Sequence, residues 1–452
     1  MQPLPLISHA SPDAIVAYRD GVAVPARQFL TDARRLAAAL PEGRRHVLNL
    51  CQDRYRFAVV LAASLLSGRV NLLPPTATPE VLGQLVAFAP DGVCLVDEEP
   101  CAGPLPILAY PEATESVEEL AEVPTIAPDQ LVAYVFTSGS TGTPVPHAKH
   151  WGPLVRNVRA EAARLGLTEG RPHGIVATVP SQHMYGLETA VLLPLQSGGA
   201  LSARRPFYPA DVWAALTSVP EPRVLVTTPV HLRALVASGL EPPGLDLVIS
   251  ATAPLPETLA RAAETSLRTR ILEIYGCTEA GQLATRFPTR GPEWQLYPGI
   301  RLEMEEDQTW AAGGHVEGRV PLADLIQPRG EDRFLLRGRT ADLVNIAGKR
   351  SSLAYLNQIL SGVPGVVDGV FFMPNQQGAT TVARLAAVVV APDLDASALM
   401  AELRRRIDPA FLPRPLLLVE RLPRNATGKL PRQALESLIL GRGPVMPVTG
   451  PS

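Results

Sequence analysis

Lysine is nearly absent from this sequence. The chain has 41 lysines and arginines together, and lysine occurs only at Lys149, Lys349 and Lys429, which leaves 38 arginines. A GC-rich genome would explain the bias. A lysine that persists in such a background is more often needed as a compact ammonium with rotatable donors. Each of the three lies near a glycine, so all three are candidates for function, with chance surface placement as the alternative.

Cysteine and net charge are low as well. The four cysteines form no CxxC pair and show no metal-ligand spacing, which indicates free thiols in a reducing compartment. The formal charge is only −3 and no basic block occurs, which excludes nucleic acid as an expected partner.

Long hydrophobic runs are missing. The uncharged stretch from Phe57 to Gly68 is too short to cross a membrane and predicts a buried helix instead. The amino terminus carries no positively charged segment of the kind that begins a secretion signal. We therefore expect a cytoplasmic protein without a membrane partner.

The composition is that of a large globular protein. The 452 residues are 46% hydrophobic and 19% charged, enough for about three domain-sized units with sizeable cores. The 46 prolines are scattered through expected loops, and no internal repeat is visible. Only residues 441–452 are expected to be a disordered tail.

Apolar runs of strand length alternate with helical patterns over the first two thirds of the chain. Continuous Val, Leu and Ile runs between helices predict mostly parallel sheets covered on both faces, hence an α/β fold. The expected strands are residues 47–50, 92–96, 131–136, 174–179, 190–195, 224–226 and 245–249.

The pattern changes twice after residue 299. Short, charged segments at 301–305, 318–321 and 334–336 predict a small β-rich layer. Strands at 369–373, 383–391 and 416–419 with a helix at 396–407 then predict a compact α+β unit. We expect a large domain over residues 1–337 and a small one over 338–440.

A loop of hydroxyl and glycine residues follows the apolar run that ends at Phe136. Glycine lets main-chain N–H groups turn toward an anion, and hydroxyl groups add donors, so this segment is typical of a phosphate-binding loop. It lacks the Gly-Lys-Ser/Thr ending of a Walker A loop. A flexible connection is the alternative. The loop comprises Thr137, Ser138, Gly139, Ser140, Thr141, Gly142 and Thr143.

Three further motifs follow in order along the chain. They begin at Tyr275 (YGCTE), Gly338 (GRTAD) and Leu422 (LPRNATGK). In kind, order and spacing, the four motifs resemble those of the AMP-forming adenylation superfamily, which contains acyl-CoA synthetases, aryl-acid ligases and peptide-synthetase adenylation domains. The resemblance implies a large amino-terminal domain and a small, mobile carboxy-terminal lid.

The resemblance also implies roles for individual residues. Glu279 corresponds to the magnesium ligand, Thr278 to an α-phosphate contact, and Lys429 to the catalytic lysine, whose ammonium positions the acid and neutralises developing charge. Besides the loop 137–143, the nucleotide site would include Thr252, Ala253, Glu273, Tyr275, Gly276, Asp324 and Arg339. A capped helix start is the structural alternative for Thr278-Glu279.

The acid and the thiol have their own expected residues. The pocket for the acid would include His183, Tyr185, Gly186, Thr228, Ser250 and Ala251, although His183 is equally well read as a core histidine. Asp342 corresponds to the hinge, and Gly348 and Arg350 to the approach of the thiol. Three positions depart from the pattern: Val145 replaces the loop lysine, Glu273 a common Asn, and Asn345 a common Lys.

Together these features predict an ATP- and Mg²⁺-dependent ligase that forms an acyl-adenylate. It would transfer a small acid, preferably aryl or hydroxyacyl, to the phosphopantetheine thiol of coenzyme A or a carrier protein. One alternative is an adenylating ligase with a non-thioester second step. A degenerate nucleotide-binding protein is another. The oligomeric state, the acid and the acceptor cannot be read from the sequence, nor can the group that replaces the missing loop lysine.

Overall fold

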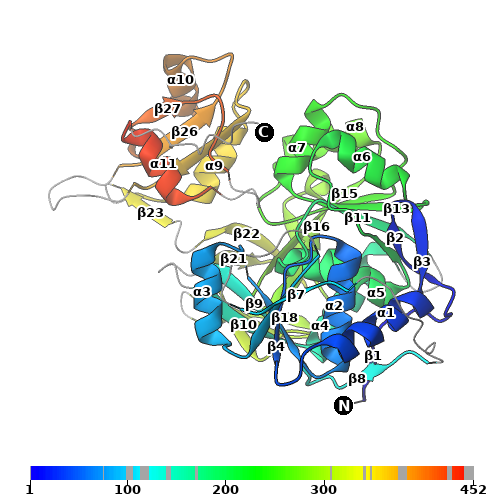
Figure 1. Ribbon diagram of the computed structural model, residues 1–452. Helices are drawn as coiled ribbons and strands as arrows, with labels where there is room; N and C mark the ends of the chain where they lie inside the picture. The colour runs from blue at the N-terminus through cyan, green and yellow to red at the C-terminus, as the bar shows by residue number, and fades with distance from the viewer. Residues whose placement is uncertain are drawn as a thin grey trace, which may run out of the picture.

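The computed structural model describes residues 2–74, 76–97, 105–111, 122–138, 144–167, 172–305, 308–339, 343–346, 349–374, 384–424 and 430–441. Two large sheets with helices around them form the main body, and a smaller group of elements near the carboxyl terminus stands apart from it (Figure 1). None of the helices in these ranges is both long and apolar enough to span a membrane.

The larger sheet has eleven strands in the described residues, in the order β21-β22-β17-β16-β15-β14-β13-β11-β12-β2-β3. Its centre from β2 to β15 is parallel and both ends are antiparallel. The central strands are β2 (Ile15–Arg19), β12 (Ala200–Ser202), β11 (Gly174–Ala177), β13 (Arg223–Thr227), β14 (Leu247–Ser250) and β15 (Ile271–Cys277). The end strands are β3 (Val22–Pro25), β16 (Gly281–Arg286), β17 (Glu293–Leu296), β21 (Asp324–Pro328) and β22 (Arg333–Arg339).

The second sheet has the order β10-β9-β5-β4-β6-β7 and is parallel except for the β9–β10 hairpin. Its strands are β4 (His46–Asn49), β5 (Val70–Leu73), β6 (Gly92–Val96), β7 (Ile107–Ala109), β9 (Leu131–Ser138) and β10 (Pro144–His150). A short pair, β1 (Leu4–Pro5) and β8 (Thr125–Ile126), lies beside it.

Helices pack on both faces of each sheet. One hydrophobic cluster joins α1 (Ala26–Ala39), α2 (Arg54–Leu66) and α4 (Trp151–Leu165) to strands of both sheets, so these helices form a shared central layer. The helices α6 (Pro209–Thr217), α7 (Pro229–Ala237) and α8 (Glu257–Leu267) pack on strands β11 to β15 in a separate cluster. α3 (Pro79–Phe88) packs against the second sheet. The predicted α/β class is therefore confirmed.

The sequence predicted the helix near Phe57 but was wrong about residues 190–195. The Asp53 side chain caps α2 by accepting from the Arg56 amide, and nearly every residue of that helix is buried. Residues 190–195, expected as a strand, belong to the π-helix η1 (Gly186–Leu192) and to α5 (Leu193–Ser197). Both are buried on all sides, and a short apolar run has no periodicity that distinguishes a buried strand from a buried helix.

The β-rich layer is present in the part of the chain where the change in sequence pattern predicted it. β18 (Ile300–Glu305), β19 (Gln308–Gly313) and β20 (Arg319–Leu322) form an antiparallel sheet that shares a hydrophobic cluster with β15, β16 and β22. The 3₁₀ turn η2 (Pro288–Arg290) precedes β17.

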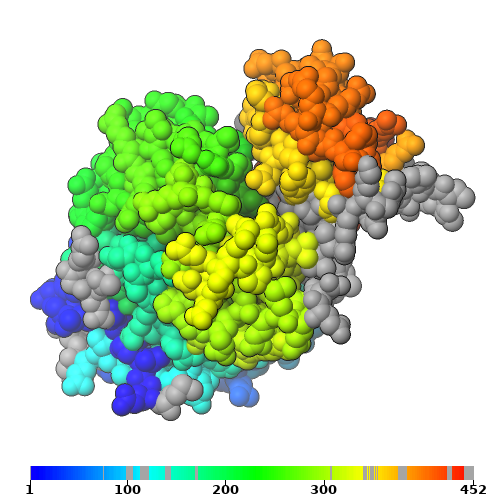
Figure 2. Space-filling model, turned by 180° about the vertical axis from the view of Figure 1, so that it is seen from behind, coloured from blue at the N-terminus to red at the C-terminus, as the bar shows by residue number. Residues whose placement is uncertain are grey.

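The last elements have hydrophobic clusters of their own, which contain no residue before Val344. β25 (Asp368–Phe372), β26 (Ala386–Val390) and β27 (Leu416–Leu418) form a sheet, with α9 (Leu353–Ser361), α10 (Ala396–Arg406) and α11 (Arg432–Ile439) around it. The hairpin β23 (Leu343–Ile346) and β24 (Lys349–Ser352) precedes them, and η4 (Pro409–Phe411) precedes β27. From behind, this group projects beyond the main body (Figure 2).

Candidate functional site

Four neighbouring parallel strands end at one edge of the large sheet. They are β11, β13, β14 and β15, and half of the predicted site residues lie at their carboxyl ends or in the segments that follow. In open α/β sheets, ligands bind outside the carboxyl ends of the strands. The sheet thus gathers residues from positions 178 to 279 at one edge.

Tyr275 connects β15 to β21. Its phenol donates to Oδ2 of Asp324 over 2.8 Å, while its ring packs against Trp294 and Phe334. Asp324 in turn lies opposite Arg339 in the register of β21 and β22. Three predicted nucleotide residues from distant parts of the chain are therefore adjacent.

Gly276 lies at an irregularity between β15 and β16. A Cβ at this position would lie 2.4 Å from the carbonyl oxygen of Gly281, closer than any side chain permits. Glycine is required here so that the two strands can approach.

Thr278 and Glu279 form part of the turn between β15 and β16. A capped helix start is thereby excluded for them. The Glu279 side chain is 44% exposed, and its Oε1 lies 3.7 Å from Nε2 of His147. Among the described residues, no group of three or more His, Cys, Asp or Glu side chains gathers to hold a metal. Mg²⁺ is commonly bound through one or two carboxylates together with substrate phosphates and water, and Glu279 offers one carboxylate.

The predicted phosphate loop connects β9 to β10. Thr137 ends the described part of β9 together with Ser138, and its hydroxyl group lies 3.0 Å from Nε2 of His147 on the opposite strand. Burial lowers the pKa of His147, against the opposing effect of Glu279. Gly139, Ser140, Thr141, Gly142 and Thr143 lie outside the described residues.

Lys149 lies beneath the Glu279 turn. This side chain is buried at 5% exposure and donates from Nζ to the main-chain oxygen of Glu279 over 3.0 Å. Burial lowers the pKa of Lys149, while the nearby charges of Glu188 and Glu317 raise it. The sequence singled out this lysine through its rarity, but the partner became visible only in the fold.

Two carboxyl groups are buried behind Lys149. Glu161 accepts from the Gln282 amide over 3.0 Å, and Glu188 accepts from the side chain of Asn157. Burial raises the pKa of each to about 8. No pattern in the sequence indicated this pair, because α4 and η1 meet only in the tertiary structure.

The turn after β14 is held by a buried carboxylate. Glu273 accepts from the Leu255 amide over 2.7 Å and from Nε of Arg286 over 2.6 Å. Thr252 in this turn has a φ of 79°, and the hydroxyl oxygens of Ser250 and Thr252 are buried without a hydrogen-bond partner among the described residues. Ala251 is buried and Ala253 half-buried beside them. Glu273 therefore stabilises this turn, which is predicted to lie next to the adenine of ATP.

The residues predicted for the acid pocket meet at the same edge. The Tyr185 phenol is buried and donates to the main-chain oxygens of Thr227 and Ile249, which joins the ends of β13 and β14. Gly186 allows the chain to turn, since a Cβ there would lie 2.0 Å from the Pro180 oxygen. His183 is half-buried, and its Nδ1 accepts from the Tyr185 amide over 3.3 Å.

His231 is a residue that the sequence analysis missed. Its Nδ1 lies 3.0 Å from the hydroxyl oxygen of Thr228, and its ring makes an edge contact with Phe207. Burial lowers its pKa, and so does the nearby Arg205. The one sequence signal that could have pointed to His231 is its position three residues after Thr228, which directly follows the end of a strand.

The remaining predictions lie largely outside the described residues. Lys429, Asp342 and Gly348 are not described. Arg350 is placed in β24 and Arg339 in β22 by their backbones alone.

The chain is similar to known proteins in both sequence and fold. A family model described as AMP-binding enzyme matches residues 8–304. A 4-coumarate–CoA ligase of Rhodobacter capsulatus is 31% identical over 233 residues, which are 51% of this chain and 57% of that protein. A 4-coumarate–CoA ligase of Halorhodospira halophila is 29% identical over 330 residues, 70% of this chain and 80% of that protein. The chain thus matches little more than half the length of the first relative.

The fold has close structural counterparts. The o-succinylbenzoate CoA synthetase from Bacillus subtilis, solved with its acyl-adenylate intermediate, superposes with a TM-score of 0.81 at 19% identity. The match covers 96% of this chain and 99% of that one. At this identity the likeness establishes the fold.

Proposed function

The chain belongs to the family of AMP-binding enzymes, and from this premise we propose that it is an ATP-dependent ligase that activates a small carboxylic acid as an acyl-adenylate and passes the acyl group to a thiol. The observation that carries the proposal is the convergence of Tyr275, Asp324 and Glu279 at the carboxyl edge of the sheet, next to Thr137 at the start of the hydroxyl-rich loop.

In the first step a carboxylate oxygen of the acid attacks the α-phosphorus of ATP, and the bond to the bridging oxygen of pyrophosphate breaks. Asp324 suits the ribose, because two carboxylate oxygens can accept from two vicinal hydroxyl groups. Thr278 would contact the α-phosphate, and the loop 137–143 the outer phosphates. In the proposal, the Lys429 ammonium neutralises charge on the reacting oxygens.

A magnesium ion fits Glu279. The carboxylate is exposed at the turn, and Mg²⁺ commonly binds one or two protein carboxylates together with substrate phosphates. When bound, the ion would neutralise phosphate charge. His147 and Lys149, linked to the side chain and the main chain of Glu279, would orient this ligand.

In the second step the thiol sulfur attacks the acyl carbon, AMP leaves with the acyl-side oxygen, and the thiol proton passes to solvent. We propose that residues 338–440 form a lid that changes orientation between the steps, with Asp342 as the hinge and Gly348 and Arg350 beside the thiol. Support comes from the separate hydrophobic clusters after Val344.

For the acid we propose an aryl carboxylate, and for the acceptor coenzyme A. Two similar proteins are 4-coumarate–CoA ligases, which supports both choices. A phosphopantetheinyl carrier protein is the second acceptor of the same chemistry.

Pyrophosphate exchange tests the proposal. ATP and radiolabelled pyrophosphate would be incubated with 4-coumarate, hydroxybenzoates, hydroxyacids and fatty acids in turn. We expect exchange with at least one aryl acid, and a loss of about a thousandfold in Lys429→Ala, the order expected for removal of a major electrostatic contact.

Two outcomes would contradict the proposal. If no acid supports exchange while ATP still binds, the chain is a nucleotide-binding protein without turnover. If exchange occurs but neither coenzyme A nor a holo carrier protein is consumed, the second step is not thioester formation.

A further inference from the structure

A concave site lies away from the residues assigned to the ligase site. It is a cavity of about 390 Å³ between the β2–β3 hairpin, α1, the first turn of α2 and the segment after β7. Its lining contains none of the residues assigned to the ligase site, and β11 and β12 separate β2 from β13. The volume falls in the range of small-molecule pockets. The polar wall consists of Arg19, Gln28, Asp32, Arg35 and Arg56.

The charge of this wall is positive. Three arginines and one aspartate line the cavity, for a formal charge of +2, which falls to +1 when Asp53, the partner of Arg19, is included. Asp32 accepts from Arg35, Gln28 and the Tyr55 phenol, so both of its oxygens are already engaged by the wall itself. The lining therefore offers an incoming molecule guanidinium donors rather than a free carboxylate.

Two of the guanidinium groups lie over tyrosine rings. Arg19 lies over Tyr55 at 5.3 Å, and Arg56 over Tyr110 at 5.1 Å. Nε of Arg19 is buried and has no hydrogen-bond partner among the described residues. Arg56 also donates from Nη1 to the main-chain oxygen of Asp97 over 3.2 Å. A guanidinium has five donors in a planar fork, which matches the geometry of a carboxylate.

The remainder of the wall is apolar. Val24, Pro111, Tyr55 and Tyr110 complete the lining, and the Tyr55 side chain is almost fully buried. Flat rings beside cationic edges suit a planar body that carries one anionic group.

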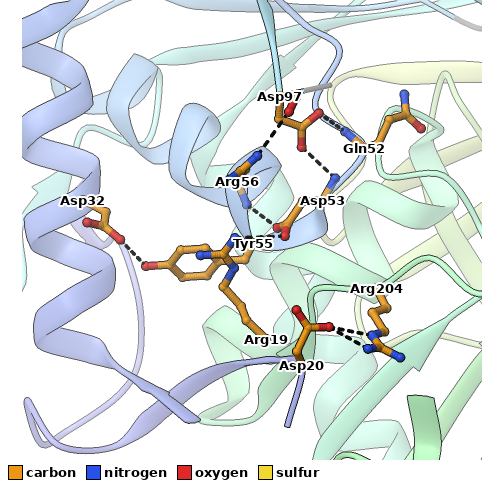
Figure 3. Close-up of polar contacts among 9 residues, drawn as sticks. All are labelled: Arg19, Asp20, Asp32, Gln52, Asp53, Tyr55, Arg56, Asp97 and Arg204. Atoms are coloured by element: carbon orange, nitrogen blue, oxygen red, sulfur yellow. Dashed lines mark hydrogen bonds and ion pairs between the residues drawn. The ribbon is translucent and has the colours of Figure 1, made fainter. Parts of the chain in front are cut away.

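Hydrogen bonds hold the first turn of α2, which forms part of the wall, in place before any ligand binds. The buried guanidinium of Arg54, between Asp53 and Tyr55 in sequence, donates to the main-chain oxygens of Ala177 and Val179, both over 3.0 Å. The Asp97 carboxylate accepts from the amides of Gln52 and Asp53, so the amino end of α2 already has an anion of its own (Figure 3). A rigid first turn reduces the ordering cost of binding.

We propose that this cavity is a binding site for a small organic anion, a carboxylate on a flat apolar body, with Arg19 and Arg56 as its anion contacts and the rings of Tyr55 and Tyr110 as its walls. The site is separate from the ligase site and does not depend on the proposed function.

Calorimetric titration of the full chain with benzoate tests the site, with benzamide as the neutral analogue and inorganic phosphate as the anion without a flat body. We expect saturable benzoate binding, at least tenfold weaker for Arg19→Gln, as for loss of one charge-assisted contact. The matched control is Arg204→Gln. Arg204 pairs with Asp20 on the same face but does not line the cavity (Figure 3).

Chemical modification of arginines identifies where benzoate binds, independently of its measured affinity. Phenylglyoxal modification followed by peptide mass spectrometry should show that benzoate protects Arg19 and Arg56 and leaves Arg204 reactive. Equal melting midpoints of the two variants and the parent chain establish that all three are folded; if Arg19→Gln is unfolded, the protection pattern of the parent chain decides.

Three results would overturn the proposal. The first is absence of saturable binding at millimolar benzoate. The second is equal affinity of Arg19→Gln and Arg204→Gln, which would place benzoate elsewhere, for instance in the pocket of the ligase substrate. The third is binding of phosphate or benzamide as tight as that of benzoate, since neither combines a charge with a flat body.

Discussion

The ammonium of Lys149 donates to the main-chain oxygen of Glu279 over 3.0 Å, although the two residues are 130 positions apart in the sequence. Val145, at the position where the family resemblance led us to expect a loop lysine, is 44% exposed on the same strand. The rare lysine after the loop therefore supports the turn that carries the expected metal ligand. It does so from a buried position, next to Glu188.

Replacement of Lys149 by methionine should impair binding of MgATP. Methionine fills similar space but leaves the Glu279 oxygen and the buried Glu188 without their cation, and an unpaired buried group costs about 1–3 kcal/mol. We expect the KM for MgATP in pyrophosphate exchange to rise about tenfold and the melting midpoint to fall. Val145→Met, exposed on the same strand, is the control. An unchanged KM would refute the supporting role.

Replacement of Tyr275 by phenylalanine should weaken ATP binding while the fold is kept. The ring still packs against Trp294 and Phe334, but Asp324 loses the phenol that orients it. Because a hydrogen bond to a charged group contributes about 1.5–3 kcal/mol, we expect a loss of roughly tenfold in ATP affinity. Asp324→Asn should cost more. Titration calorimetry with ATP measures both, and equal affinity of Tyr275→Phe and the parent chain would remove Tyr275 from the site.

The stability of the main body should fall as pH rises from about 5 to 8. Burial raises the pKa of Glu161 to about 8, so the folded chain holds a proton that the unfolded chain releases near the ordinary value of 4.5. Stabilisation from this group is complete below pH 4.5 and is lost as pH approaches 8, by up to about 1.4 kcal/mol per pH unit.

Glu161→Gln provides the test of that dependence. Its amide cannot ionise, so the melting midpoint of the variant should depend less on pH over this interval than that of the parent chain. Glu305→Gln, an exposed carboxylate of β18, is the control and should leave the slope unchanged. Parallel slopes for Glu161→Gln and the parent chain would show that Glu161 is ionised throughout.

Arg233→Gln should affect the second half-reaction more than the first. Nη1 of Arg233 in α7 lies 3.2 Å from Oδ2 of Asp368 in β25, the beginning of the small sheet. Asp368 also pairs with Arg424 of the small unit. The Arg233 pair is partly exposed, so its loss should cost under about 1 kcal/mol of stability. If the small unit moves, loss of this contact should change the ratio of thioester formation to pyrophosphate exchange by severalfold. Arg261→Gln, on α8, is the control, and an unchanged ratio would contradict a docking role.

Much of the main body could be predicted because its signals are local. Continuous apolar runs mark β9, β11 and β14 as buried parallel strands, and the break in texture near Gly299 marks the β-rich layer. The prediction of a strand at residues 190–195 was wrong for a related reason. It also used a local signal, but this apolar run is too short to distinguish the period of a strand from that of a helix. Glycine at position 276 was predicted as part of a motif, but the reason for it, contact with Gly281, is not local.

By itself the sequence determined the α/β class, the family, and the order of the motifs along the chain. Those properties follow from local patterns and from residue types at fixed spacing. Only the tertiary structure decided that Lys149 faces Glu279, that Tyr275 reaches Asp324, and that three arginines and two tyrosines line one cavity. These relationships join elements far apart in the chain, and their energies depend on burial and on distances that no local pattern specifies.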